Sequence, residues 1–421
     1  MQFLLRRLWI VFLIAGCSTE AARAQKTLTW QEVKEEFERS NPTLRAARIG
    51  IDESRADEVT AYLRPNPDFT IAVDQVAAFS NNPDHYRPFS FALPYLSTSY
   101  LHERRNKREL RLTSAQKATA IAQSQFADQE RNLIFNLRNA FIQILQAKAV
   151  RELAKQNLTY YDHELDISRD RYKAGDIARV DLDRLELQRV QYEADLQTAE
   201  VNLRTAKIQL LQLLNDRTAV EQFDVSGAFD FSEQILLPDD LRRMALEARP
   251  DLKAAVQAID KAQTDYRLAV ANGSTDPTFG MDFAGQNPPI PVYIGASITI
   301  PLRIFDRNQG EKARTRLDIT RNERLRDAAQ TQVFSDVDSA FATLNSTVTL
   351  LRPYKSQYLA QAARVRETIA FSYQHGQASL VDFLDAQRDY RSVQLSYLNL
   401  VGSYLAAAGQ LNLAVGREVI Q

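Results

Sequence analysis

Residues 172–213 read YKAGDIARVDLDRLELQRVQYEADLQTAEVNLRTAKIQLLQL, which joins a turn to a long apolar pattern. Steps of three and four residues from Leu182 trace a stripe that only Arg189 interrupts: Leu182, Leu185, Tyr192, Leu196, Ala199, Leu203, Ala206, Leu210 and Leu213. A seven-residue repeat of this kind is typical of a helix in a coiled coil. The stretch therefore predicts a helix over about 180–215 that follows a turn at Gly175.

The same pattern returns about 200 residues further along the chain. Adding 201 to each stripe position, that of Arg189 included, gives a second series: Phe383, Ala386, Tyr390, Val393, Tyr397, Leu400, Tyr404, Ala407, Leu411 and Ala414. The turn motif recurs at the same offset, as Tyr172, Gly175 and Asp181 and then as Tyr373, Gly376 and Asp382. A period this long indicates duplication of one large structural unit rather than a solenoid.

Two further motifs support the duplication. Asn41-Pro42-Thr43-Leu44-Arg45-Ala46-Ala47 returns as Arg249-Pro250-Asp251-Leu252-Lys253-Ala254-Ala255 at an offset of 208, and Asn139-Ala140-Phe141 returns as Ser339-Ala340-Phe341 at an offset of 200. We interpret residues 17–215 as a first repeat, 216–237 as an inter-repeat segment and 238–421 as a second repeat.

Each repeat combines helical patterns with two short strand patterns. No Pro interrupts a helical pattern from about Arg104 to Tyr172, and a shorter one covers 44–63. Apolar residues alternate with polar or small ones in three stretches: Phe69, Ile71 and Val73; Phe89, Phe91 and Leu93; and Val292, Ile294, Ala296, Ile298 and Ile300. This alternation predicts half-buried strands. The predicted fold is therefore mostly α with a small β part, and four strands per chain leave two open edges that further copies could close.

The N-terminus has the pattern of an export signal. Arg6 and Arg7 precede an apolar run over 8–15 that is too short to span a bilayer, so we predict a lipoprotein-type signal peptide over 1–16. Small residues before the only cysteine indicate lipidation of Cys17 as the mature start. Cleavage after Ala24 is the alternative, because Ala22-Arg23-Ala24 fits the ordinary small-x-small rule.

Composition excludes several classes of function. The chain has 52 Lys and Arg against 53 Asp and Glu, so its charge does not favour nucleic acid as a partner. One Cys and four His leave no material for a Cys-rich zinc site. Asp162, His163, Glu164 and Asp166 are too close in sequence to share one helix face as metal ligands. We find no phosphate-binding loop and no nucleophile elbow, so we expect no enzyme activity, no cofactor and no metal site.

The chain resembles the outer-membrane efflux proteins, the TolC-like exit ducts of Gram-negative export pumps. The resemblance is carried by the Pro-x-Leu-x-Ala-Ala helix starts, Leu93-Pro94 and Ile300-Pro301 at strand ends, the Ala-Phe pairs of the long helices, and the turns 171–182 and 372–386. It implies a homotrimer whose strands close a 12-stranded outer-membrane β-barrel and whose helices continue as a periplasmic α-barrel. It also implies two protein partners, a periplasmic adaptor and an inner-membrane pump.

The resemblance further implies roles for the two turns as periplasmic tips. Tyr172, Gly175, Asp181, Tyr373 and Gly376 would lie where the adaptor is met, and Asp382 and Asp385 match an acidic pair at the pore constriction. The residues themselves predict left-handed caps at the two glycines and carboxylates placed to favour the next helix start. Ala378 departs from the best-known members, in which an Arg at this place can tie the two tips together.

Two functions remain open from the sequence. The first is an outer-membrane exit channel of a tripartite efflux or secretion system, in a Gram-negative bacterium. The alternative is a periplasmic coiled-coil scaffold or adaptor without a pore. The alternating strands discriminate between them, because a scaffold has no need for strand pairs with one apolar face. Drugs, metal ions, polypeptides and metabolites all pass through ducts of this build, so the sequence does not name the substrate.

Overall fold

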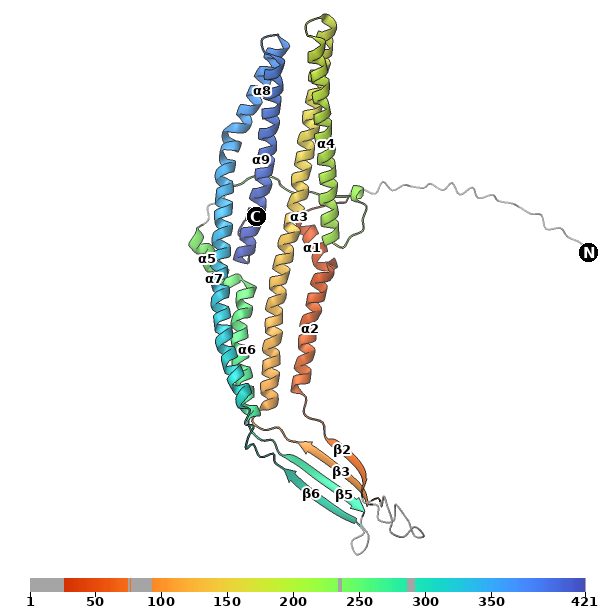
Figure 1. Cartoon of the computed structure of the whole chain (residues 1–421), viewed down its shortest axis with the longest axis vertical. Coiled ribbons are helices and arrows are strands. Elements are labelled where there is room, and N and C mark those ends of the chain that lie inside the picture. Colours follow the sequence, from red (N-terminus) through yellow and green to blue (C-terminus); the bar gives the residue numbers. More distant parts are fainter. Residues whose placement is uncertain (1–25, 75, 77–92, 234–236, 286–291, 421) are drawn as a thin grey trace, which may run out of the picture. The chain divides into compact units, whose positions relative to one another are not determined.

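The computed structural model describes residues 26–74, 76, 93–233, 237–285 and 292–420. Their contacts divide the chain into two compact units. Unit 1 takes the described residues of 1–40, 140–230 and 358–402, and unit 2 takes those of 41–139, 231–357 and 403–421. Each unit therefore contains segments from both halves of the sequence (Figure 1). The signal peptide, Cys17 and the strand residues Phe89 and Phe91 lie outside the described residues.

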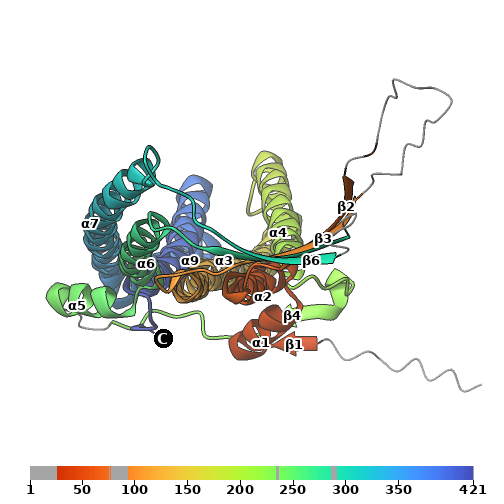
Figure 2. The same cartoon turned by 90° about the horizontal axis from the view of Figure 1, so that it is seen from below.

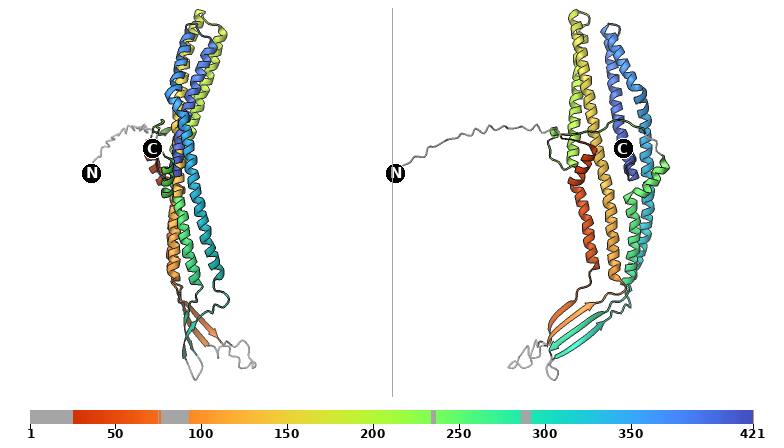
Figure 3. Two further views of the ribbon diagram at one scale, coloured as in Figure 1. Left: turned by 90° about the vertical axis from the view of Figure 1, so that its left-hand side faces the viewer. Right: turned by 180° about the vertical axis from the view of Figure 1, so that it is seen from behind.

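Unit 1 is built from antiparallel helices. The second part of α3 (Lys107–Ala174) runs beside α4 (Arg179–Leu213), and α8 (Leu359–Gln374) runs beside the first part of α9 (Leu380–Val415), as Figures 1 and 3 show. Their apolar stripes meet in one buried cluster: Tyr161, Leu165, Leu182, Leu185, Tyr192, Ala370, Tyr373, Leu380 and Phe383. The predicted helices over 104–172 and 180–215 are confirmed, and the heptad stripe of α4 is buried except at Leu196 and Leu213, which are half-buried.

A small parallel sheet also belongs to unit 1, and the sequence analysis did not predict it. β1 (Lys26–Leu28) pairs with β4 (Phe223–Val225), next to α1 (Trp30–Ser40) and a 3-10 turn at Val220–Gln222. Asp224 holds this sheet on the helices, because its carboxylate lies 2.8 Å from Lys148 Nζ and 3.3 Å from Lys207 Nζ. Lys207 is itself buried and donates a hydrogen bond to the Phe223 carbonyl.

Unit 2 contains the remaining helices. They are α2 (Pro42–Tyr62), α5 (Pro238–Ala248), α6 (Pro250–Asn272) and α7 (Gln309–Pro353), with the first part of α3 and the end of α9. A π-helical turn at Tyr354–Tyr358 follows α7. The predicted helix over 44–63 is confirmed as α2, where Pro42 occupies a first-turn position that needs no N–H donor. No helix among the described residues is long and apolar enough to cross a membrane.

Four antiparallel strands of unit 2 form one sheet, in the order β2-β3-β5-β6. Their bounds are Asp68–Asp74, Leu93–Leu101, Thr278–Gly285 and Val292–Thr299. Figure 2 shows the sheet as a single curved layer. The expectation that Leu93-Pro94 ends a strand is wrong, since these residues begin β3. A proline is tolerated there because the first residues of a strand can do without a donor. Ile300-Pro301 does follow the end of β6, as predicted.

The register gives the sheet one apolar and one polar face. Paired positions place Phe69 opposite Thr98, Leu96 opposite Phe283 and Phe283 opposite Ile294. This face collects exposed apolar side chains from all four strands: Phe69, Ile71, Val73, Leu96, Phe279, Met281, Phe283, Val292, Ile294 and Ile298. The opposite face carries Tyr95, whose hydroxyl donates to the Asp282 carboxylate at 2.9 Å.

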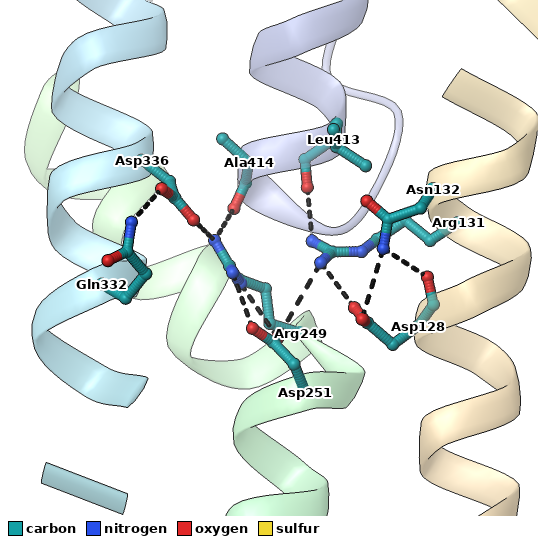
Figure 4. Close-up of polar contacts among 9 residues, drawn as sticks. All are labelled: Asp128, Arg131, Asn132, Arg249, Asp251, Gln332, Asp336, Leu413 and Ala414. Atoms are coloured by element: carbon teal, nitrogen blue, oxygen red, sulfur yellow. Dashed lines mark hydrogen bonds and ion pairs between the residues drawn. The ribbon is translucent and has the colours of Figure 1, made fainter. Parts of the chain in front are cut away.

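An ion cluster fixes the junction where α6 begins (Figure 4). The Arg249 side chain is only 5% exposed, and its Nε and Nη2 groups donate to the Asp251 carboxylate. Its Nη1 group donates to Asp336 at 2.7 Å and to the Ala414 carbonyl at the end of α9. Burial raises the pKa of Asp251, but hydrogen bonds and charge from Arg249 outweigh it and hold the pKa below its ordinary value. This carboxylate therefore stabilises the fold above a pH of about 3.9 and loses that effect as the pH falls further.

Replacing Arg249 by Met should lower the free energy of unfolding by about 3 kcal/mol, because two carboxylates then lose their shared buried cation. Thermal unfolding, followed by helical circular dichroism, measures the change. Arg243→Met is the matched control, since Arg243 pairs with Asp240 on the surface of α5 and its loss should change stability by less than about 0.5 kcal/mol. Equal effects of the two substitutions would show that the cluster does not hold the junction.

Candidate functional site

The turn between α3 and α4 ends the long helix with a left-handed glycine. Gly175 has φ +87°, and its N–H donates to the Tyr172 carbonyl at 3.0 Å. The next N–H, of Asp176, donates to the Arg171 carbonyl at 2.9 Å, which completes a Schellman motif. The left-handed cap predicted at Gly175 is confirmed.

The turn between α8 and α9 repeats this geometry. Gly376 has φ +72°, its N–H donates to the Tyr373 carbonyl at 3.1 Å, and the Gln377 N–H donates to the Ser372 carbonyl at 2.8 Å. A Cβ on Gly175 or Gly376 would meet no atom within 4 Å. Backbone conformation alone, and not space, therefore requires glycine at both turns.

Asp382 caps the start of α9. Its carboxylate accepts from the Ser379 hydroxyl at 2.7 Å and from the Ser379 N–H at 3.1 Å, while the Asp382 N–H donates back to the Ser379 hydroxyl oxygen. These hydrogen bonds lower the pKa of Asp382 from its ordinary value. Asp181 occupies the corresponding first turn of α4, but the N-cap residue there is Ala178 and no side chain caps that helix.

Asp385 lies one turn after Asp382 on α9, and both side chains are exposed. Residues three apart share a helix face, so the two carboxylates form one acidic patch. Arg388 lies 3.1 Å from Asp385. Asp382 therefore contributes to capping the helix, and the charge of Asp385 is partly neutralised by Arg388.

The two turns are linked within unit 1 by a cation that the sequence analysis missed. Arg171, from the last turn of α3, donates to the Tyr373 carbonyl at 3.0 Å and lies 5.1 Å from the centre of the Tyr373 ring. Glu164 is buried and accepts from the Gln374 amide at 3.0 and 3.2 Å. The cation that joins the two turns is therefore Arg171, which belongs to the first half of the chain. Ala378 in the second half has no charged group.

A second link stacks one guanidinium between two rings. Arg366 of α8 lies 4.4 Å from the ring centre of Tyr160 and 3.8 Å from that of Tyr390. Such contacts strengthen when they are shielded from water. Sequence reasoning could not find this link, because Tyr160 lies far from Arg366 and Tyr390 in the sequence and all three residues fit an ordinary helical pattern.

A groove of about 630 Å³ lies between α3, α4 and α9. Amide and hydroxyl side chains make up most of its polar lining: Gln143, Gln146, Asn157, Thr198, Asn202 and Gln209. Arg391 and Asp195 close one side as an ion pair of 2.9 Å. The groove therefore offers neutral hydrogen-bonding groups and no acid–base or nucleophilic cluster.

The acidic segment around His163 does not form a metal site. Asp162 binds Arg189 at 2.6 Å and Asp166 binds Arg169 at 3.1 Å, whereas Glu164 is buried against Gln374. These side chains therefore point in different directions around α3. In the part of the chain that the structure describes, no group of three His, Cys, Asp or Glu side chains could hold a metal ion.

Comparison with known proteins gives a consistent result. The family model described as outer membrane efflux protein matches residues 33–216 and 241–417. The chain is 23% identical over 396 residues to the cobalt-zinc-cadmium resistance protein CzcC of Cupriavidus metallidurans, covering 90% of this chain and 87% of CzcC. It is 22% identical to the outer membrane efflux protein BepC of Brucella suis, covering 97% and 89%. The solved structure of CusC superposes with a TM-score of 0.78 at 17% identity, covering 92% of each chain.

Gly175→Ala should lower the free energy of unfolding by about 1–2 kcal/mol, because the turn forces an L-residue into the left-handed region. Gly175→Asn should restore part of the loss, since Asn tolerates that region. Denaturant unfolding measures both. Gly310→Ala is the control, because Gly310 lies in the first turn of α7 with open space around it and alanine should be neutral or stabilising there. A neutral Gly175→Ala would contradict the proposed constraint.

Proposed function

Because the chain belongs to the outer membrane efflux protein family, we propose that it is the outer-membrane exit channel of a tripartite efflux or secretion system. In this role it takes substrate from an inner-membrane pump and a periplasmic adaptor and passes it to the exterior. The observation that carries the proposal is the two-faced sheet of unit 2, which exposes apolar side chains on all four strands. A scaffold without a pore has no use for such a sheet.

The sheet also supports a homotrimer. Both of its outer strands, β2 and β6, are edges, and an isolated four-stranded sheet leaves their backbone groups unpaired. Three copies related by a threefold axis would supply twelve strands and close a barrel whose apolar face meets lipid. The polar face, with Tyr95 and Asp282, would then line the lumen.

The two capped turns would form the periplasmic tips. The residues proposed for adaptor contact lie in or beside short connections that backbone hydrogen bonds hold: Tyr172, Gly175 and Asp181 at the first turn, and Tyr373 and Gly376 at the second. The acidic patch of Asp382 and Asp385 would lie at the pore constriction, where threefold symmetry brings six carboxylates together. Arg388 pairs with Asp385 and offsets one of the two charges in each copy, so the ring keeps a net negative charge, which attracts cations and disfavours anions by its field.

Purified protein should form a trimer that conducts ions across a planar bilayer, and Asp382→Asn combined with Asp385→Asn should weaken its cation selectivity. The trimer should persist, because Ser379 still caps the start of α9 and an Asn side-chain oxygen can still accept from it. Single-channel recordings and native mass spectrometry measure the two effects.

The matched control removes two exposed carboxylates of α3 instead, by Asp166→Asn and Asp170→Asn. A wild-type protein that neither assembles nor conducts would refute the channel. Unchanged selectivity in the Asp382 and Asp385 variant would place this acidic patch outside the pore.

The lipoprotein-type signal leads to a second proposal, that Cys17 anchors the mature N-terminus to the outer membrane. Mass spectrometry of the N-terminal peptide should then find diacyl or triacyl modification on Cys17, and Cys17→Ser should abolish it. A mature chain that begins unmodified at Gln25 would show that cleavage follows Ala24 instead.

A further inference from the structure

The polar face of the four-stranded sheet carries negative charge only. Within the bounds described, its strands contain Asp68, Asp74 and Asp282 but no Lys, Arg or His. All three aspartates lie on the face opposite Phe69 and Phe283, because successive side chains of a strand alternate between the two faces. A carboxylate on this face therefore finds no cation on the strands that surround it.

Two tyrosines lie beside the last of these aspartates. One row of the sheet pairs Ala284 of β5 with Tyr95 of β3 on one side and with Tyr293 of β6 on the other. Asp282 lies two residues from Ala284 and therefore on the same face. Ala284 is only 3% exposed, whereas Tyr293 is 41% exposed. The two aromatic side chains thus share one face with a single small, shielded residue between them.

The two oxygens of Asp282 have different surroundings. Oδ1 accepts a hydrogen bond from the Tyr95 hydroxyl at 2.9 Å. Oδ2 lies beside Gly295, which is the direct partner of Asp282 on β6. The Tyr95 hydroxyl therefore orients the carboxylate, and Oδ2 is the oxygen directed at the place where Gly295 lacks a side chain.

Gly295 leaves room between the carboxylate and an aromatic ring. A Cβ at this position would lie 3.5 Å from Asp282 Oδ2 and 3.7 Å from Tyr293 Cε2, which are ordinary contact distances. A glycine inside a strand weakens it, and such a glycine often marks a bulge or the close approach of a ligand. The pairing of β5 with β6 runs without a break from Gly285 to Thr278, so no bulge accounts for Gly295.

The first half of the chain shows that the sheet does not need this arrangement. The β2–β3 hairpin is the counterpart of the β5–β6 hairpin, and at the matching place it pairs Ala72 with Tyr95 instead of Asp282 with Gly295. Strand pairing is therefore satisfied without a carboxylate opposite a glycine. The second pair is then free to serve a ligand.

The groups around Gly295 match the chemistry of an organic cation. A carboxylate attracts a positive charge, and the face of a tyrosine ring attracts alkylated ammonium groups through its quadrupole. Both lie within contact distance of one point, so a single ammonium group could touch them together.

A metal ion fits these groups poorly. Mg²⁺ requires six ligands and Ca²⁺ six to eight, nearly all of them oxygens. Asp282 and the Tyr95 hydroxyl supply one carboxylate and one hydroxyl, and the part of the chain described here contains no group of three His, Cys, Asp or Glu that could hold a metal. The aromatic ring of Tyr293 adds attraction for an organic cation but no oxygen ligand at the Gly295 point.

We propose that Asp282, Tyr293, Tyr95 and Gly295 form a transit site for organic cations that carry an alkylated ammonium group. The inference rests on the proposed exit channel, in which this face lines the lumen, and it assigns a class of substrate to that lumen. Each copy of the chain would provide one site. Binding should be weak, because a site inside a conducting lumen must also release its ligand.

Block of the potassium current by tetraethylammonium tests the site. Single trimers in a planar bilayer carry Asp382→Asn and Asp385→Asn throughout, so that the acidic patch of α9 does not contribute to the block. Tetraethylammonium added on the exterior side should reduce the current. Asp282→Asn should raise the half-blocking concentration about fivefold, because the partly exposed ion pair is lost.

Asp68→Asn is the matched control for charge. It removes a carboxylate from the same face, but the row of Asp68 contains only Ser99, Gly280 and Ser297 and no aromatic ring. The half-blocking concentration should therefore change less than about twofold.

Two further variants test the ring and the space beside it. Tyr293→Leu should raise the half-blocking concentration about two- to fivefold, whereas Tyr293→Phe keeps an aromatic face and should retain the block. Gly295→Ala should weaken the block as well, because its methyl group occupies the point between the carboxylate and the ring. Unchanged block in both Tyr293→Leu and Gly295→Ala would overturn the assigned geometry.

The outcomes separate this inference from the proposed function. A wild-type protein that does not conduct would refute the channel itself. A conducting trimer in which Asp282→Asn leaves the block unchanged, or in which Asp68→Asn has the same effect, would overturn the site alone. Mg²⁺ tests the class of ligand: a block by Mg²⁺ that exceeds that of tetraethylammonium and disappears in Asp282→Asn would overturn the assignment to organic cations.

Discussion

The apolar stripe of each long helix must be covered by another helix, and this burial constrains the rest of the fold. In unit 1 the stripe of α4 closes over Tyr161, while Phe383 of α9 stacks on Tyr373 with ring centres 4.9 Å apart. Within one turn α3 buries both Ile142 and Ile144, which are two residues apart and therefore point to nearly opposite sides of the helix. A helix with two buried sides needs two neighbours, which favours a closed arrangement of helices over a single hairpin.

The two halves of the chain use different side chains to satisfy a carbonyl group at the end of a helix. Asn41 caps α2 through its own side chain, with the Leu44 N–H at 3.0 Å, and the preceding Ser40 hydroxyl donates to the Leu214 carbonyl after α4. In the second half Arg249 replaces the cap and reaches the Ala414 carbonyl near the end of α9. A neutral hydroxyl and a buried guanidinium thus perform the same task, the satisfaction of a terminal helix carbonyl.

Periodic features were predictable from the sequence, whereas features that depend on distant partners were not. The heptad stripe, the long helix before Tyr172 and the left-handed glycines follow from local spacing and backbone sterics. The three-residue strands β1 and β4 are too short for a periodic signal, and they pair across almost 200 residues. At the site, Gly175 and Gly376 were predictable because each acts through its own φ angle. Arg171 and Arg366 were missed because their partners are set by tertiary packing.

The π-helical turn at Tyr354–Tyr358 accommodates a one-residue difference in length between the two halves. The offset between the halves is 200 at Ala140 and Ala340 but 201 at Tyr172 and Tyr373, so one extra residue lies between these points in the second half. A π turn is the way in which a helix absorbs a single inserted residue. Without it, every later side chain would rotate by about 100° around the helix axis. The turn confines the extra residue to five positions, so the apolar stripe beyond it keeps the phase that it has in the first half.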